Sequence, residues 1–126
     1  MFHPFQRMRY AIGVIACITA LTAAAAPAAP GAADYDLARR YSGDTGERND
    51  PQQAFTHMLK AAEQGNMTAQ NELAFMYFNG NVAVPRNLPR AFEWFTKAGA
   101  NGSIVAQCML GDFYRDGLGG ARQEYA

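Results

Sequence analysis

The sequence predicts an all-α fold built from stacked pairs of antiparallel helices, with about two and a half pairs along the chain. The first observation behind this prediction is a repeat. Lys60-Ala61-Ala62 returns as Lys97-Ala98-Gly99, and Gly65 returns as Gly102, a spacing of 37 (97 − 60). The second is that apolar residues inside each unit recur at helical spacing. A period between about 20 and 50 residues is typical of an array in which each unit buries its apolar face against its neighbours.

The first helix of each unit shows as an apolar stripe. Ala69, Leu73, Met76 and Tyr77 stand at i, i+4, i+7 and i+8, and Gly80 is placed to end the helix. The same intervals recur before and after this unit, which predicts first helices there too, from Val105 to Arg115 in the last unit. The repeated structural positions, in both helices, are Leu37, Tyr41, Gly43, Ala54, Ala69, Leu73, Tyr77, Gly80, Ala91, Ala106, Leu110, Tyr114 and Gly117.

The second helix of each unit has a start signal. Asp50 and Asn87 are good N-cap residues, and Pro51 and Pro89 follow them in the first turn, where proline is tolerated. The expected buried side of the later helix consists of Ala91, Phe92, Trp94, Phe95 and Ala98, and that of the earlier one of Ala54, Phe55, Met58, Leu59, Ala61 and Ala62.

One small residue follows each core leucine, at Ala38, Ala74 and Gly111. We expect it to let the two helices of a pair approach closely, since facing helices pack about 8–10 Å apart.

The sequence stops at Ala126, where the second helix of the third unit should begin. We therefore expect Leu110, Phe113 and Tyr114 to lack cover, and one hypothesis is that this polypeptide is a truncated, non-functional fragment of a longer repeat protein.

The first 25 residues have the layout of a secretory signal peptide. Arg7 and Arg9 give a positive start, an apolar run covers 10–21, and small residues fill 23–30. We expect cleavage near 25–28 and a repeat domain over 29–126, with units of about 29–65, 66–102 and 103–126. A single membrane span is disfavoured because about 20 apolar residues are needed and this run is shorter. The protein is thus expected to be exported, periplasmic or secreted, with no stable membrane span after the leader is removed.

A second interpretation of the leader is open. Val14-Ile15-Ala16-Cys17 resembles the box of bacterial lipoproteins, in which the cysteine is lipidated and anchors the protein to a membrane. Against this, the residues after Cys17 stay apolar. Either way Cys108 is the one free thiol of the mature chain, because Cys17 leaves with the leader or carries lipid, and a single thiol forms no internal disulfide.

The charge balance argues against a nucleic-acid partner. The sequence has eleven Lys and Arg and eleven Asp and Glu, so its formal net charge is zero. Loss of Arg7 and Arg9 with the leader leaves 11 − 2 = 9 basic groups against eleven acidic ones. A mildly acidic domain offers no basic surface to a phosphate backbone. At 126 residues the chain has room for one domain.

The order Ala-x3-Leu-Ala/Gly-x2-Tyr-x2-Gly, followed by Ala-Phe, Lys-Ala-Ala and Gly, resembles the Sel-one-like repeat, a relative of the tetratricopeptide repeat. The match is nearly complete over 69–102 and extends over 33–125. The resemblance implies a right-handed superhelical solenoid that holds proteins or peptides and performs no chemistry. Two segments depart from the pattern: the loop 80–85 is one residue longer, and Gly117-Leu118-Gly119-Gly120 has glycine where valine is expected.

Candidate catalytic residues are few. The mature chain has one histidine, His57, which aligns with Trp94 and is therefore expected to be packed or half-buried. A triad needs Ser, His and Asp together, and a metal site needs several Cys or His at close spacing. We expect no catalytic residue, no metal and no cofactor. An envelope enzyme acting on cell-wall material is the weaker alternative, since this chain lacks the paired cysteines of relatives linked to that chemistry.

A protein or peptide partner, of unknown identity, is expected on the concave side, which the first helices line in folds of this kind. Phe75 and Phe78 would be exposed aromatic anchors; the alternative is that they pack on the neighbouring hairpin. The candidate binding residues are those of the first helices that lie off the apolar stripe, namely Tyr35, Arg39, Asn71, Phe75, Phe78, Asn79, Cys108, Asp112 and Arg115.

Overall fold

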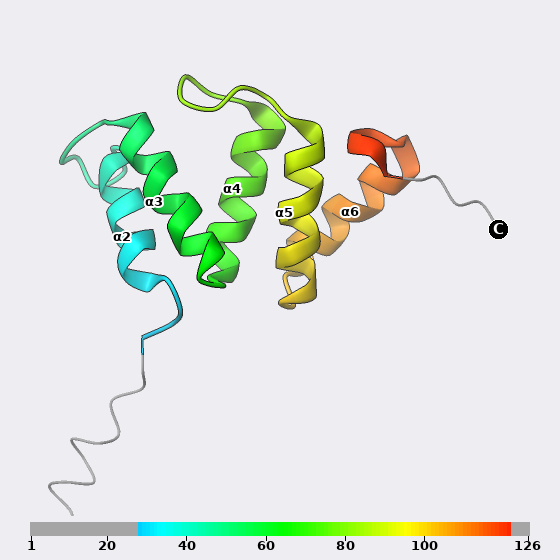
Figure 1. The fold of residues 1–126 in the computed structure, drawn as a ribbon, viewed down its shortest axis with the longest axis horizontal. Coiled ribbons are helices and arrows are strands. Elements are labelled where there is room, and N and C mark those ends of the chain that lie inside the picture. Colours follow the sequence, from blue (N-terminus) through cyan, green and yellow to red (C-terminus); the bar gives the residue numbers. More distant parts are fainter. Residues whose placement is uncertain (1–27, 122–126) are drawn as a thin grey trace, which may run out of the picture.

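The structure, a computed structural model, describes residues 28–121. Five α-helices follow one another in this part of the chain: α2 (Ala32–Tyr41), α3 (Pro51–Glu63), α4 (Met67–Asn79), α5 (Leu88–Ala100) and α6 (Ile104–Asp116), followed by the short 3₁₀ helix η1 (Leu118–Gly120). They stand side by side in chain order, as a solenoid of helix pairs (Figure 1). The all-α prediction is confirmed, and the described residues contain no strand beyond one isolated bridge, between Ser42 and Asn49.

The helix starts lie where the sequence places them. The Asp50 carboxylate accepts from the backbone N of Gln53 at 3.2 Å, and the Asn87 side chain accepts from the backbone N of Arg90 at 3.1 Å. Each bond satisfies one of the N–H groups that a helix leaves unpaired at its start. Both second helices are therefore N-capped as predicted.

The repeat is geometric as well as sequential. Gly65 and Gly102 both have φ of +94°, and each turns the chain from a second helix into the next first helix. The Gln70 amide donates to the carbonyl of Ala62 at 3.1 Å, and the Gln107 amide donates to the carbonyl of Gly99 at 3.2 Å. The same side-chain bond thus ties each first helix to the preceding second helix.

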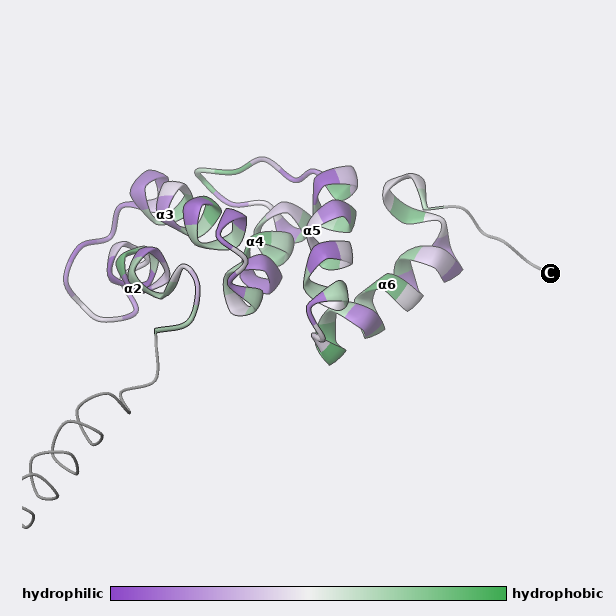
Figure 2. Cartoon of the chain, turned by 60° about the horizontal axis from the view of Figure 1, so that its bottom comes forward, coloured by the Kyte–Doolittle hydropathy of each residue, from purple (hydrophilic) through white to green (hydrophobic). Residues whose placement is uncertain are grey.

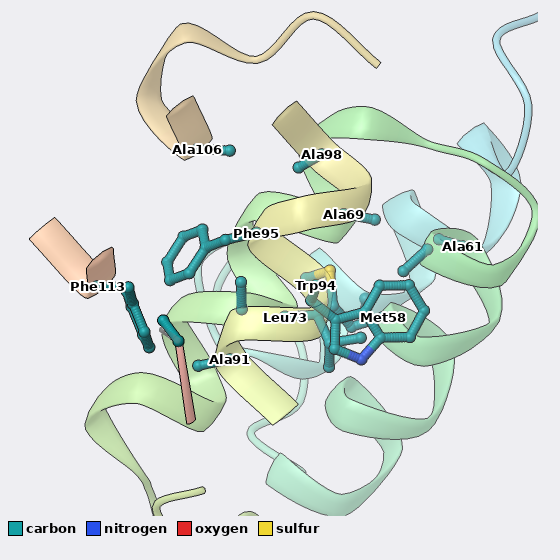
Figure 3. Packing of buried hydrophobic residues seen from close by; sticks show 14 residues of the cluster. Met58, Ala61, Ala69, Leu73, Ala91, Trp94, Phe95, Ala98, Ala106 and Phe113 are labelled. Atoms are coloured by element: carbon teal, nitrogen blue, oxygen red, sulfur yellow. The ribbon is translucent and has the colours of Figure 1, made fainter. Parts of the chain in front are cut away.

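The core runs along the array between successive helices. Leu73, Phe95 and Phe113 are its largest fully buried side chains, and alanines fill the closest approaches (Figure 3). The helices α3 and α5 present apolar residues on one side and hydrophilic residues on another (Figure 2). Leu37 is an exception among the repeat positions: it is 36% exposed, whereas its equivalent Leu73 is 0% exposed, because no described helix precedes α2.

The expected lack of cover over Phe113 is wrong. Phe113 is 0% exposed, and its ring lies 5.8 Å from those of Phe78, Phe92 and Phe95. The loop after α6 closes the remaining side, since a Cβ on Gly119 would lie 3.2 Å from the Phe113 ring. Leu110 is half-buried, and Tyr114 keeps 49% exposure while contacting the Phe92 ring.

Gly111, the small residue that follows the leucine of the third unit, is not packed as its equivalents Ala38 and Ala74 are. Ala38 and Ala74 are completely buried, as close helix packing requires. Gly111 is exposed, and a Cβ added there would meet nothing within 4 Å. The expectation for Gly111 is therefore wrong, because no helix of the described chain packs on that side of α6.

The two loops that depart from the repeat pattern are both closely packed. Gly80 has φ of +70°, and a Cβ there would lie 2.8 Å from the Arg86 backbone N, so glycine is required. Val84 inserts from this loop into the protein and is buried, and Ala121, 37 residues later, is buried in the second loop.

The signal peptide, its cleavage site and the lipidation candidate Cys17 lie outside the described residues. Within 28–121, no helix is long and apolar enough to span a bilayer.

Candidate functional site

The candidate binding residues occupy equivalent positions on α2, α4 and α6. Four of the nine contact another helix or the residue that caps it, namely Tyr35, Asn71, Phe75 and Phe78. Tyr35 and Arg39 lie on α2, four residues lie on α4, and Cys108, Asp112 and Arg115 lie on α6. These contacts decide which side chains can meet a ligand.

The two phenylalanines are not free anchors. Phe75 is half-buried and packs edge-on against Phe95 of α5, with ring centroids 5.0 Å apart. Phe78 is half-buried against Phe113 of α6, and the Arg86 guanidinium lies 5.9 Å from its ring centre. Phe78 thus packs on the next hairpin, as the alternative predicted, while Phe75 packs on the second helix of its own pair.

Asn71 and Asn79 differ in their surroundings. The side-chain oxygen of Asn71 accepts from the Ser103 hydroxyl at 2.9 Å, and the same hydroxyl caps the start of α6 by accepting from the Ala106 backbone N. Asn71 therefore helps to hold α6 against α4. Asn79 is exposed at the end of α4 and is available to a partner.

Tyr35 and Arg39 belong to a polar cluster that links α2 to α4. The Tyr35 hydroxyl donates to the Glu72 carboxylate at 2.6 Å and accepts from the Arg39 guanidinium at 3.3 Å. Arg39 also pairs with Asp44 at 3.1 Å. Burial raises the pKa of Tyr35, and donation to the Glu72 carboxylate raises it further, because both favour the neutral phenol.

The residues on α6 are more exposed. Cys108 is an exposed free thiol. Arg115 lies 2.9 Å from the Asp112 carboxylate and 3.2 Å from that of Asp116, and these two carboxylates raise its pKa. All three charged side chains are about half exposed or more, so these ion pairs contribute little to stability.

A hollow of about 430 Å³ lies between the first helix pair and α4. Its apolar lining comes from α2, α3 and α4, and its polar lining includes two carboxylates, Asp44 and Glu72. Two of the candidate residues, Phe75 and Asn79, line it. A second hollow of about the same volume is lined by Leu37, Arg40, Tyr41, Glu47 and Arg48. The first hollow is the one that contains candidate residues and joins two helix pairs, so it is the candidate site for part of another molecule.

Sequence reasoning missed several residues of this hollow. The apolar ones are Met58 and Met76, which the pattern assigned to the core, and the acidic ones are Glu72 and Asp44. The periodicity gave no signal for Asp44, which follows α2 in a loop. Glu72 is the only charged residue of α4, and that isolation on an otherwise uncharged helix was the available signal.

His57 is half-buried, as predicted, and serves packing between α2 and α3. Its Nδ1 lies 3.0 Å from the Asp34 carboxylate, and its ring stacks on Tyr41 at 5.6 Å with planes 5° apart. Asp34 also accepts from the Gln64 amide at 2.7 Å. The hydrogen bonds from His57 and Gln64 lower the pKa of Asp34. Among the described residues no group of three or more His, Cys, Asp or Glu is placed to hold a metal ion.

The comparisons with known proteins agree with this fold. The Sel1 repeat model matches residues 31–66, 68–103 and 104–126. A crystal structure of a Sel1 repeat protein from Oxalobacter formigenes superposes with a TM-score of 0.67 and 35% identity, covering 73% of this chain and 68% of that one. A protective antigen present in uropathogenic Escherichia coli strains, which displays the SLR fold, superposes with a TM-score of 0.61 and 31% identity over 68% of this chain and 18% of that one.

This chain belongs to the Sel1 repeat family. It forms a helical repeat scaffold of the kind that generally mediates interactions between proteins, and proteins of this family are generally non-catalytic. The chain spans only 18% of the length of the second of these two solved relatives.

Proposed function

We propose that the protein is an exported scaffold that binds a protein or peptide through the concave surface of its first helices. The observation that carries the proposal is the hollow of about 430 Å³, because it lies where α2, α3 and α4 meet and combines apolar with polar lining. The leader in the sequence, with its positive start, apolar run and small-residue stretch, supports export to the periplasm or the medium.

Binding at this surface is tested by site-specific photo-crosslinking. A photoreactive phenylalanine analogue replaces Asn79, which is exposed and lines the hollow, and in a matched protein it replaces Glu93, which is exposed on α5 away from it. We expect a discrete adduct from position 79 and none from position 93 in the cells that naturally produce the protein. Equal labelling from both positions, or none from either, would count against the proposed surface.

Export is tested separately. Cell fractionation followed by mass spectrometry of the purified chain is expected to give a mature N-terminus between residues 26 and 29, from cleavage near 25–28. Recovery of the intact N-terminus in the cytoplasm would contradict export. A lipidated Cys17 at the N-terminus would show that the chain is a membrane-anchored lipoprotein.

A further inference from the structure

We propose that the hollow between α2, α3 and α4 binds a lysine side chain presented by an extended peptide. This inference rests on the proposed function and names the chemistry of the partner. It is drawn from three features of the hollow: an apolar lining that fits an alkyl stem, carboxylates that fit a cationic tip, and free amides that fit a peptide backbone.

The apolar lining suits an unbranched alkyl chain. It consists of Ala38, Ala54, Met58, Phe75 and Met76, from three different helices. Methionine side chains are flexible and adapt to irregular shapes, and lysine commonly buries its methylene stem on apolar surface while its ammonium stays in a polar setting.

The charge of the lining is complementary to a cation. Asp44 and Glu72 are its two charged residues, and neither Lys nor Arg is among the described residues that line it. Arg39 lies nearby and pairs with Asp44, but both side chains are about half exposed, so this ion pair is weak and can yield to an incoming ammonium group. The carboxylates of Asp44 and Glu72 and the guanidinium of Arg39 together carry a net charge of −1.

The hydrogen bonds around Glu72 favour lysine over arginine. Its Oε1 accepts from the Tyr35 hydroxyl at 2.6 Å, and within the described residues no hydrogen bond reaches Oε2. A guanidinium binds a carboxylate best through two parallel bonds, one to each oxygen, and the Tyr35 hydroxyl competes for Oε1 because it takes one of the two acceptor sites of that oxygen. An ammonium group acts as a point charge, so a hydrogen bond to Oε2 alone is enough to bind it.

Two asparagines are placed to hold the peptide backbone. Asn79 is exposed beside the hollow, and Asn81 lines it as well. The side-chain oxygen of Asn81 accepts from the backbone N–H groups of Ala83 and Val84, at 2.9 and 2.8 Å, which fixes the amide and leaves its NH₂ group to donate. A donor of this kind matches a peptide carbonyl.

The experiment is an NMR titration of the ¹⁵N-labelled repeat domain, residues 29–126, with four acetylated and amidated tripeptides, Ala-X-Ala. X is lysine, arginine, norleucine or glutamate. Norleucine keeps the alkyl stem and lacks the ammonium group. Because the ammonium group adds a hydrogen bond to a charged acceptor, we expect the lysine peptide to bind about tenfold more tightly than the norleucine peptide, a difference of about 1.4 kcal/mol. The amide signals that move are expected to include those of Glu72, Asn79 and Asn81.

Two variants locate the interaction. Glu72→Gln removes the charge but keeps an acceptor for Tyr35, so the fold is retained, and it is expected to abolish most of the difference between lysine and norleucine. Glu93→Gln makes the same change in net charge on α5, outside the hollow, and should leave the difference intact. Circular dichroism of each variant checks that the helices remain.

Several outcomes would overturn the lysine assignment. With the unmodified protein, these are equal affinities for the lysine and norleucine peptides, tighter binding of the arginine or glutamate peptide than of the lysine peptide, or no binding of the lysine peptide. With the variants, it is an equal effect of Glu72→Gln and Glu93→Gln on the difference between lysine and norleucine. If crosslinks from position 79 persist in that case, the binding surface stands and only the lysine assignment fails. If those crosslinks are missing too, the proposed function fails with it.

Discussion

Replacing Phe113 by alanine tests whether α6 is packed into the array or merely appended to it. Phe113 is 0% exposed and contacts three other phenylalanine rings, each with centroids 5.8 Å away. Truncation of a buried phenylalanine to alanine costs about 3–5 kcal/mol, from lost burial and the cavity left behind. Since small domains unfold with about 5–15 kcal/mol, this is a large part of the total.

The matched control is the next residue. Tyr114 is 49% exposed and makes one ring contact, with Phe92 at 5.6 Å. Its replacement by alanine is expected to cost about 0.5–1.5 kcal/mol. Urea unfolding followed by far-UV circular dichroism gives both values. Had α6 been uncovered, as its place at the end of the array led us to expect, the two substitutions would cost about the same. Equal costs, or a cost for Phe113→Ala below about 1 kcal/mol, would refute the packing described here.

Two further predictions concern glycine and pH. Gly80→Ala is expected to destabilise the protein by at least about 1 kcal/mol, because φ is positive there and the new Cβ would press on the Arg86 backbone. Gly111→Ala is expected to stabilise the protein by about 0.5–1 kcal/mol, because this site is helical and a Cβ there would meet nothing. Thermal unfolding of both variants measures this, and a reversed order would contradict the loop geometry. The hydrogen bonds from His57 and Gln64 keep the pKa of Asp34 below its usual 3.8, so its contribution to stability is present above that value and is lost as the pH falls through the lower, folded pKa. Asp34→Asn is expected to flatten the acid side of the stability profile, and an unchanged profile would show that these bonds do not contribute.

Features that depend on neighbours in the sequence were predictable. The caps at Asp50 and Asn87, the terminating glycine at position 80 and the apolar stripe through Leu73 are local signals, and each lies where the pattern placed it. A repeat adds the information that units stack, because none of them can bury its own apolar face alone.

Features that depend on how separate elements meet were not predictable. Phe113 is covered by three rings from two other helices and by a loop, and no spacing rule reports that arrangement. Tyr35 and Glu72 lie 37 positions apart and meet only because α2 and α4 are neighbours. The hollow itself lies where three helices and two loops meet, and its acidic residues come from α4 and from the loop after α2, so they carried no periodic signal.

The paired glutamine bonds have a consequence for building longer versions of this protein. Gln70 and Gln107 each attach their amide to a carbonyl at the end of the preceding helix, at nearly equal lengths of 3.1 and 3.2 Å. One side-chain hydrogen bond per unit therefore joins each first helix to the preceding second helix in the same way. A copy of residues 66–102 appended to the array would carry this hydrogen bond along. We therefore expect the bond to recur at the new boundary between units.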